Sequence, residues 1–162
     1  MTMPFRMSPV GFVLAMIKAR GSFNRMADRT ARSDAVAMSA ADLVDALGSN
    51  ADHPWKPPGG GFEGALSHDV IHGLDITVGV GLDRRVPEDR LRIVLDGIRP
   101  KNVEFFGVDL AGVELRADDL DWHYGSGSPL RGSAQDLVLV LCGRLLPAGH
   151  LHGEQSARFT RS

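Results

Sequence analysis

Two histidines and an aspartate near the middle of the chain have the types and spacing of a metal site. His68 and His72 are four residues apart in the run Ser67-His-Asp-Val-Ile-His-Gly-Leu-Asp75. If this run is helical, the two imidazoles project from the same face about one turn apart, so both can reach one metal ion. Asp75 falls on the same stripe, but it is too far along the helix from His68 to bind the same ion. We therefore expect it to orient His72.

The spacing alone leaves two interpretations open, because a histidine pair also occurs as two solvated or hydrogen-bonded side chains. Gly73 favours a built site. Glycine costs about 1 kcal/mol in a helix interior relative to alanine, so its presence indicates that a neighbouring helix or a ligand comes close. The predicted metal ligands are His68 and His72, with Asp75 behind His72. The pattern identifies neither catalytic nor cofactor-binding residues.

A helix over about residues 62–80 must carry these side chains. Its other side has an apolar stripe at helical spacing, made of Leu66, Val70, Leu74 and Val78. Residues 49–62 contain Gly59-Gly60-Gly61 and several prolines, which predict a loop before this helix. That loop is either a plain connector or a rim of the histidine site.

Caps and periodicity predict the remaining elements, and they divide the chain into two parts. Further helices are expected over residues 8–21, 22–35, 39–48 and 86 to about 98. Later elements are a strand at 113–116, a strand pair within 118–132, a helix over 133–142, and a final strand or extended tail through Phe159. We therefore expect a mainly α protein, with a helical metal-binding domain over residues 1–100 and a small α+β region over residues 101–162.

The composition excludes several classes of protein. The 162 residues are 43% apolar and 23% charged, which is typical of one globular chain. The net charge of −2 argues against a general nucleic-acid binder. Cys142 is the only cysteine, which excludes an intramolecular disulfide and fits a reducing cytosol. No apolar run approaches the about 20 residues of a membrane helix, and no signal peptide is evident. The composition predicts a cytoplasmic protein that binds neither nucleic acid nor membranes.

The histidine run belongs to a wider set of motifs. The set contains Arg20-Gly21-Ser-Phe-Asn24, His68-Asp-Val-Ile-His72-Gly-Leu-Asp75, Asp119-Leu-Asp-Trp122, Leu130-Arg-Gly-Ser-Ala-Gln-Asp-Leu137 and Gly143-Arg144. Together these segments resemble the mycothiol-dependent maleylpyruvate isomerase family, within the DinB-like metal-binding helical bundle superfamily. The resemblance covers nearly the whole chain. It implies a four-helix bundle that holds a divalent metal, zinc in the first instance, followed by a small α+β C-terminal region.

The resemblance also implies a function. A member of this family would be a metal- and mycothiol-dependent isomerase or transferase, acting in the cytoplasm on a small electrophilic or dicarboxylate substrate. Its partners would be that substrate and a low-molecular-weight thiol.

One departure from the family leaves the activity open. Family members have a further metal-binding histidine early in the second bundle helix. Its counterpart would fall just before Met1, so we expect an incomplete bundle without its N-terminal helix. Such a bundle exposes apolar surface, which favours a homodimer. A metal site with only two histidines would be open and would bind the ion weakly. The alternative function is therefore a non-catalytic metal-binding or small-ligand-binding domain.

Overall fold

The computed structural model describes residues 8–54, 56 and 60–161. The chain forms two compact units, residues 1–55 and 56–162, each described here by itself. The described residues are mainly helical, with one four-stranded sheet, as the sequence predicts. The loop expected over residues 49–62 lies partly outside the described residues, at 55 and 57–59.

The described part of the first unit contains the helices α2 (Pro9–Lys18), α3 (Phe23–Ala37) and α4 (Ala40–Ser49). Each begins after a serine whose side chain accepts a hydrogen bond from a backbone N–H of the first turn, so the predicted starts are confirmed. Of the side chains described in this unit, only Ala19 and Met26 are buried. Apolar residues of α2, including Val10 and Ile17, stay exposed.

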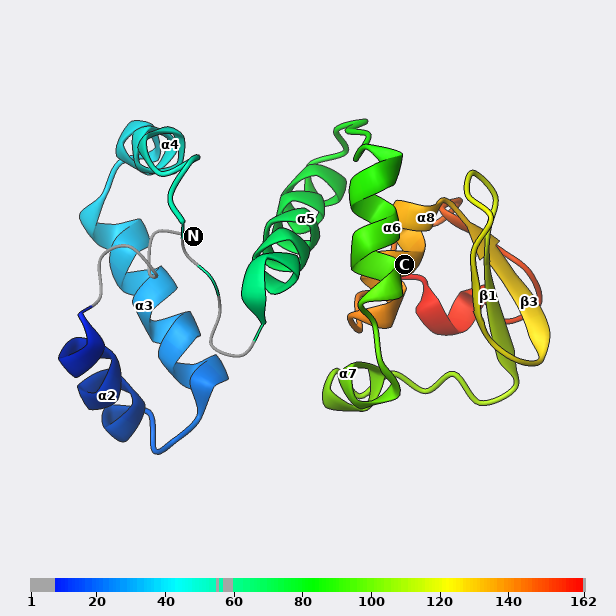
Figure 1. The fold of residues 1–162 in the computed structure, drawn as a ribbon, viewed down its shortest axis with the longest axis horizontal. Helices are drawn as coiled ribbons and strands as arrows, with labels where there is room; N and C mark the ends of the chain where they lie inside the picture. The colour runs from blue at the N-terminus through cyan, green and yellow to red at the C-terminus, as the bar shows by residue number, and fades with distance from the viewer. Residues whose placement is uncertain (1–7, 55, 57–59, 162) are drawn as a thin grey trace. The chain divides into compact units, whose positions relative to one another are not determined.

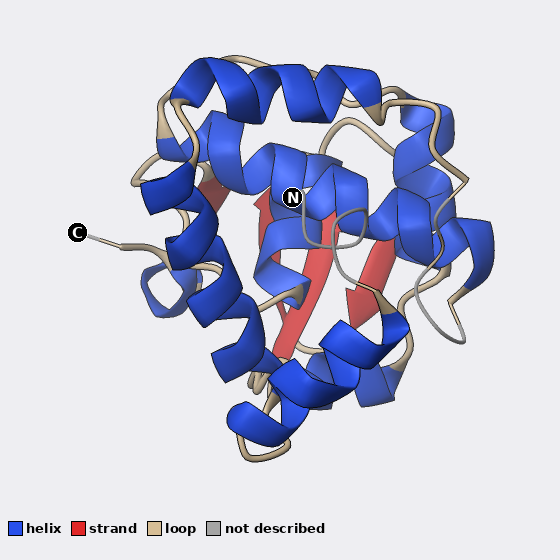
Figure 2. Ribbon diagram, turned by 90° about the vertical axis from the view of Figure 1, so that its left-hand side faces the viewer, coloured by secondary structure: helices blue, strands red, loops and turns tan. Residues whose placement is uncertain are grey.

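The second unit combines helices with the sheet around one core. Its elements are α5 (Gly61–Gly79), α6 (Glu88–Asp96), α7 (Pro100–Phe105), β1 (Val113–Ala117), β2 (His123–Gly125), β3 (Ser128–Gly132), α8 (Ala134–Leu141), β4 (Leu151–His152) and the 3₁₀ helix η1 (Ser156–Phe159). In Figure 1, α5, α6 and α8 lie on one side of the sheet. Figure 2 shows the strands in red and the helices in blue. Leu74 of α5, Val94 of α6 and Leu137 of α8 are buried in one cluster with Leu115 and Leu130 of the sheet. The boundary expected near residue 100 therefore falls inside this unit.

The strand order differs from the expected pairing. The order is β2-β1-β3-β4, with β2 antiparallel and β3 parallel to β1. The two strands within residues 118–132 both exist, but they lie on opposite sides of β1 and do not pair with each other. The chain crosses the start of β1 at Gly127, whose φ is +135°. A Cβ at Gly127 would overlap the backbone of Gly112, so only glycine allows this crossing.

The sequence does not predict helix α7, and the C-terminal tail differs from its prediction. Helix α7 begins at Pro100, and the Asn102 side chain accepts a hydrogen bond from the Arg99 backbone N–H. The tail forms β4 and then η1. None of the helices that the structure describes combines the length and the apolarity needed to cross a bilayer.

Candidate metal centre

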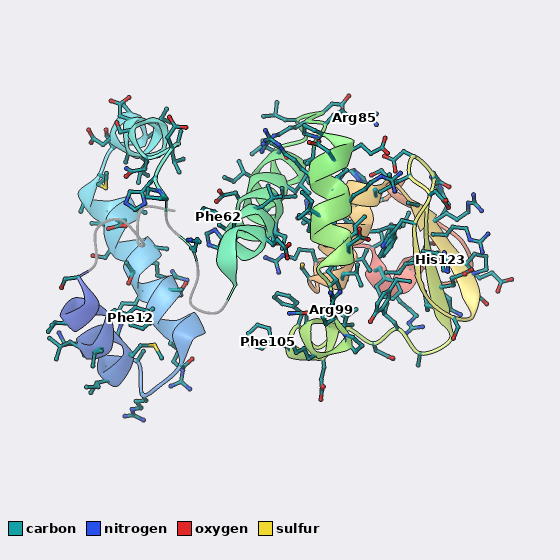
Figure 3. All side chains as sticks on the ribbon, viewed as in Figure 1. Phe12, Phe62, Arg85, Arg99, Phe105 and His123 are labelled. Atoms are coloured by element: carbon teal, nitrogen blue, oxygen red, sulfur yellow. The ribbon has the colours of Figure 1, made fainter. Side chains whose placement is uncertain are left out.

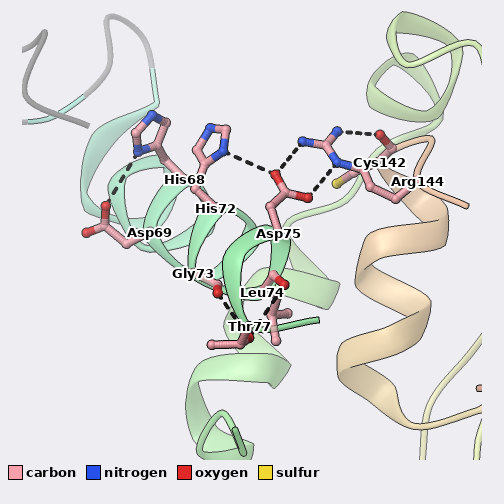
Figure 4. A network of polar contacts seen from close by, with 9 residues as sticks. All are labelled: His68, Asp69, His72, Gly73, Leu74, Asp75, Thr77, Cys142 and Arg144. Carbon is pink, nitrogen blue, oxygen red and sulfur yellow. Dashed lines mark hydrogen bonds and ion pairs between the residues drawn. The ribbon is translucent and has the colours of Figure 1, made fainter. Parts of the chain in front are cut away.

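Helix α5 presents both predicted ligands on one face. Val70 and Leu74 are buried on the core side of the helix, and Figure 4 shows the rings of His68 and His72 next to each other on another side. The ring centroids are 4.6 Å apart, with an angle of 73° between the ring planes. The two side chains are 31% and 42% exposed, so a cation can reach them from solvent.

A carboxylate lies beside Nδ1 of each histidine. The distance from His72 Nδ1 to Asp75 Oδ2 is 3.2 Å, and that from His68 Nδ1 to Asp69 Oδ1 is 3.4 Å. A neutral imidazole that donates its Nδ1–H to a carboxylate keeps the lone pair of Nε2. This arrangement favours the tautomer in which both Nε2 atoms can bind a metal. Asp69 is not among the site residues predicted from the sequence, although it directly follows His68.

Arg144 is the principal residue of the site that the histidine spacing does not reveal. Its Nε and Nη2 atoms donate to the two carboxylate oxygens of Asp75 at 3.0 and 2.8 Å, and its Nη1 atom donates to the carbonyl oxygen of Cys142 at 2.6 Å. The guanidinium also lies 5.9 Å from the ring centroid of Phe106. Arg144 follows α8 through Gly143, which has a positive φ of 75° and packs against the Phe106 backbone. The C-terminal region thus fixes the carboxylate that contacts His72.

The surroundings of His72 keep its imidazole neutral. Burial lowers the pKa of His72, and the nearby His68 lowers it further. The Asp75 carboxylate acts in the opposite direction, and the Arg144 charge adds a lowering contribution. The net result is a pKa below the ordinary value for histidine. Since metals bind the neutral imidazole, this environment suits a ligand.

Asp75 stays ionised for a different reason. Burial alone would raise the pKa of its carboxyl, but the hydrogen bonds and charge of Arg144, with a smaller contribution from His72, hold that pKa below its ordinary value. The hydrogen bonds to Asp75 also raise the pKa of Arg144. Asp75 and Arg144 therefore form a stable ion pair at neutral pH.

Gly73 lies against the side chain of Arg84, and not against the neighbouring helix or ligand that its position predicts. The guanidinium of Arg84 lies against α5 at this point, and its Nη1 atom is so close to the position of a Cβ at Gly73 that Arg84 would have to move for a methyl group to fit. The contact involves only the end of a flexible, exposed side chain. Gly73 therefore accommodates Arg84.

Cys142 and His150 do not belong to this group of potential metal ligands. Cys142 is buried, and burial raises the pKa of its thiol to about 11, so it stays protonated. His150 lies 3.0 Å from the buried carboxylate of Asp136 through Nδ1. Asp136 also accepts a hydrogen bond from the Ser133 hydroxyl at the start of α8. His150 thus connects the 147–150 loop to α8.

The donor set at α5 fits a divalent ion held by two protein ligands. Across residues 8–54, 56 and 60–161, no group of three or more His, Cys, Asp or Glu side chains is arranged to hold a metal. Imidazole ring nitrogens suit zinc and similar cations. The remaining coordination positions would belong to water, a thiol or a substrate.

Comparisons with protein-family models, with curated proteins and with solved structures found no match to this chain. The family resemblance therefore stays a prediction from the motifs.

Proposed function

We propose that the chain is a metal- and thiol-dependent enzyme whose centre is His68 and His72 on α5. One observation carries this proposal. The His72 ring contacts Asp75, and Asp75 is held at both oxygens by Arg144. Metal-binding histidines in proteins usually have such a carboxylate behind them, because it fixes the ring orientation and the tautomer. Two solvated surface histidines need no such support.

The family part of the proposal rests on the motif resemblance. We infer a DinB-like helical bundle in which α5 is the metal-binding helix, and a cytoplasmic reaction of the maleylpyruvate isomerase type. Mycothiol would be the thiol, and a small electrophile or dicarboxylate would be the substrate.

Each residue of the site has a distinct part in this reaction. A bound divalent metal, zinc in the first instance, would supply a Lewis acid that stabilises a thiolate or polarises a carbonyl oxygen. His68 and His72 would hold it through the ring nitrogens that face away from the carboxylates. Asp75 fixes the His72 ring, and Arg144 fixes Asp75.

The thiol of this reaction has to come from outside the chain. Cys142 is the only cysteine in the sequence. It is buried, and a pKa of about 11 keeps it as the unreactive thiol at neutral pH. A separate small-molecule thiol would meet the metal at the exposed side of the two imidazoles.

The second candidate function is a non-catalytic domain that binds a metal or a small ligand. The observation in its favour is the two-histidine donor set among the described residues, since zinc enzymes ordinarily have three protein ligands. Such a domain would bind the ion weakly and turn over no substrate.

A turnover assay distinguishes the two functions. The purified chain, loaded with zinc, is mixed with maleylpyruvate and mycothiol, and the cis-to-trans isomerisation is followed by absorbance. The enzyme proposal predicts turnover that requires both zinc and thiol, disappears in His72→Ala, and persists in Arg92→Gln. Arg92 is a suitable control because it forms an exposed ion pair with Glu88 on another helix. Zinc binding with no thiol-dependent turnover of maleylpyruvate or of a reactive electrophile such as a bimane would favour the non-catalytic domain.

A further inference from the structure

The outer face of the sheet carries a row of basic side chains, one from each strand. The strand register aligns Arg116 of β1 with His123 of β2 and with Arg131 of β3, and it aligns Arg131 with His152 of β4. Residues directly opposite in a sheet point to the same face. Their neighbours Leu115 and Leu130 point to the other face and are buried. The sequence pattern did not reveal this row, since its members come from four separate segments.

This face is open in the second unit. All four side chains are exposed, with Arg116 and Arg131 at 49% and 50%. The helices α5, α6 and α8 lie on the opposite side of the sheet in Figure 1, and Figure 3 labels His123 at the sheet. An external molecule can therefore reach the whole row.

The two arginines use few of their donors within the described part of the chain. Arg116 donates through Nη2 to Glu114 at 2.9 Å, and Arg131 donates through Nε to Asp118 at 2.9 Å. By contrast, all three guanidinium nitrogens of Arg144 donate to protein oxygens. Among the described residues, the other N–H groups of Arg116 and Arg131 have no hydrogen-bond partner.

Each arginine of the row is paired with one nearby carboxylate. Arg116 and Arg131 are direct partners in the parallel pair, and like charges opposite each other weaken a sheet. The compensating carboxylates are Glu114 on β1 and Asp118, which directly follows β1. The adjacent positions on β2 and β3 are Gly125 and Pro129, which have no long side chains to block an approach.

We propose that this row binds the diphosphate group of a small molecule. Two guanidinium groups on neighbouring strands, whose backbones are about 4.8 Å apart, suit two linked phosphoryl groups, because each planar fork can donate two N–H bonds to one phosphate. His123 and His152 extend the donor row on both sides, to a total of about 14 Å across three strand spacings. The site lies apart from the proposed metal centre, and it does not depend on the proposed function.

Calorimetric titration of the full chain tests the proposal, with pyrophosphate and ADP as probes in magnesium-free buffer. Both probes contain a diphosphate group. The ratio of the chain's affinities for them shows whether the site prefers a free or an esterified diphosphate. We expect saturable binding at one site, and a loss of at least about tenfold in affinity in the double variant Arg116→Gln/Arg131→Gln. The double variant Arg116→Lys/Arg131→Lys keeps the charge. Its affinity is expected to lie between that of the unaltered chain and that of the glutamine double variant. Arg92→Gln is the matched control and should bind like the unaltered chain.

Three results would overturn the proposal. They are the absence of saturable binding of either probe, an unchanged affinity in the glutamine double variant, and equally tight binding of maleate through the same residues. Far-ultraviolet circular dichroism shows whether each variant is folded. If the glutamine variant fails to fold, the lysine variant and His123→Gln/His152→Gln decide, with weaker binding expected in both.

Discussion

Arg144 binds both carboxylate oxygens of Asp75 from a position 69 residues farther along the chain. The pair links the histidine helix α5 to the segment that follows α8, and Figure 4 shows it directly behind His72. Asp75 in turn contacts Nδ1 of His72 at 3.2 Å. The orientation of a predicted metal ligand therefore depends on a residue of the C-terminal region.

Replacement of Arg144 should weaken metal binding without removing a ligand. In Arg144→Gln, Asp75 loses its bidentate partner and is free to rotate away from His72. We expect the zinc affinity to fall by about tenfold or more, the usual effect of losing a group that orients a ligand. Competition with a chromophoric chelator measures this affinity. Arg92→Gln, which breaks the Arg92–Glu88 pair on α6, should leave it unchanged. Equal zinc affinity in both variants would show that Arg144 has no part in the metal site.

The stability of the metal-free protein should fall as the solution becomes acidic. The pKa of His72 and the pKa of Asp75 are both lowered in the folded chain, so the unfolded chain binds more protons than the folded one as the pH falls. The stabilisation from His72 is present above about pH 6.5, the ordinary histidine pKa, and is lost below it. The stabilisation from Asp75 is present above its ordinary pKa of about 4 and is lost at still lower pH. Urea unfolding at a series of pH values measures both effects.

The variant Asp75→Asn/Arg144→Gln tests this assignment. It removes the carboxyl and its cationic partner together, so the decline below about pH 4 should become shallower than in the unaltered chain. An identical pH profile in the two proteins would contradict the contribution of the Asp75–Arg144 pair.

Replacement by alanine should change the free energy of unfolding in opposite directions at two glycines. Gly73→Ala removes the helix-propensity penalty of about 1 kcal/mol, and the new methyl group meets only the movable end of Arg84. We expect the free energy of unfolding to rise by about 0.5–1 kcal/mol. At Gly127, where φ is +135°, a methyl group would overlap the Gly112 backbone. Gly127→Ala should cost about 2 kcal/mol or more.

Urea unfolding of both glycine variants provides the measurement. A destabilised Gly73→Ala protein would mean that the Arg84 contact holds α5 in place. A Gly127→Ala protein as stable as the unaltered chain would contradict the crossing of the chain over β1.

Cys142 should resist thiol reagents in the folded protein. It is buried, and a pKa of about 11 leaves almost no thiolate at pH 8. Reaction with Ellman's reagent should be slow in buffer and complete in urea, at one thiol per chain. Rapid labelling of the native protein at pH 8 would show an accessible thiolate and reopen the question of which thiol takes part in the reaction.

Local signals in the sequence predict the helices well. Ser8, Ser39 and Ser133 each accept a hydrogen bond from a backbone N–H in the first turn of a helix, as their positions predict. The apolar stripe and the histidine pair likewise predict α5 and the face that carries the site. These features depend on residues within about one helical turn of each other, so they can be predicted from short stretches of the sequence.

Relationships between distant segments could not be predicted in this way. No local pattern indicates that Arg144 would meet Asp75, because nothing in either segment encodes the position of the other. The strand order was missed for a similar reason. Gly125 and Gly127 predict a turn, but a turn alone does not show that the chain crosses β1 before β3 begins. The short helix α7 depends on Pro100, a residue that equally well ends a structured segment.

The central claim is that His68 and His72 bind one cation together, and metal analysis of the purified chain tests it most directly. In equilibrium dialysis against zinc, we predict saturation at about one bound zinc per chain, a ratio that follows from one pair of imidazoles. The zinc should be lost in both His68→Ala and His72→Ala, and retained in His152→Ala, whose histidine lies on the sheet. Zinc binding that is absent from the unaltered chain, or equal in all four proteins, would contradict the claim.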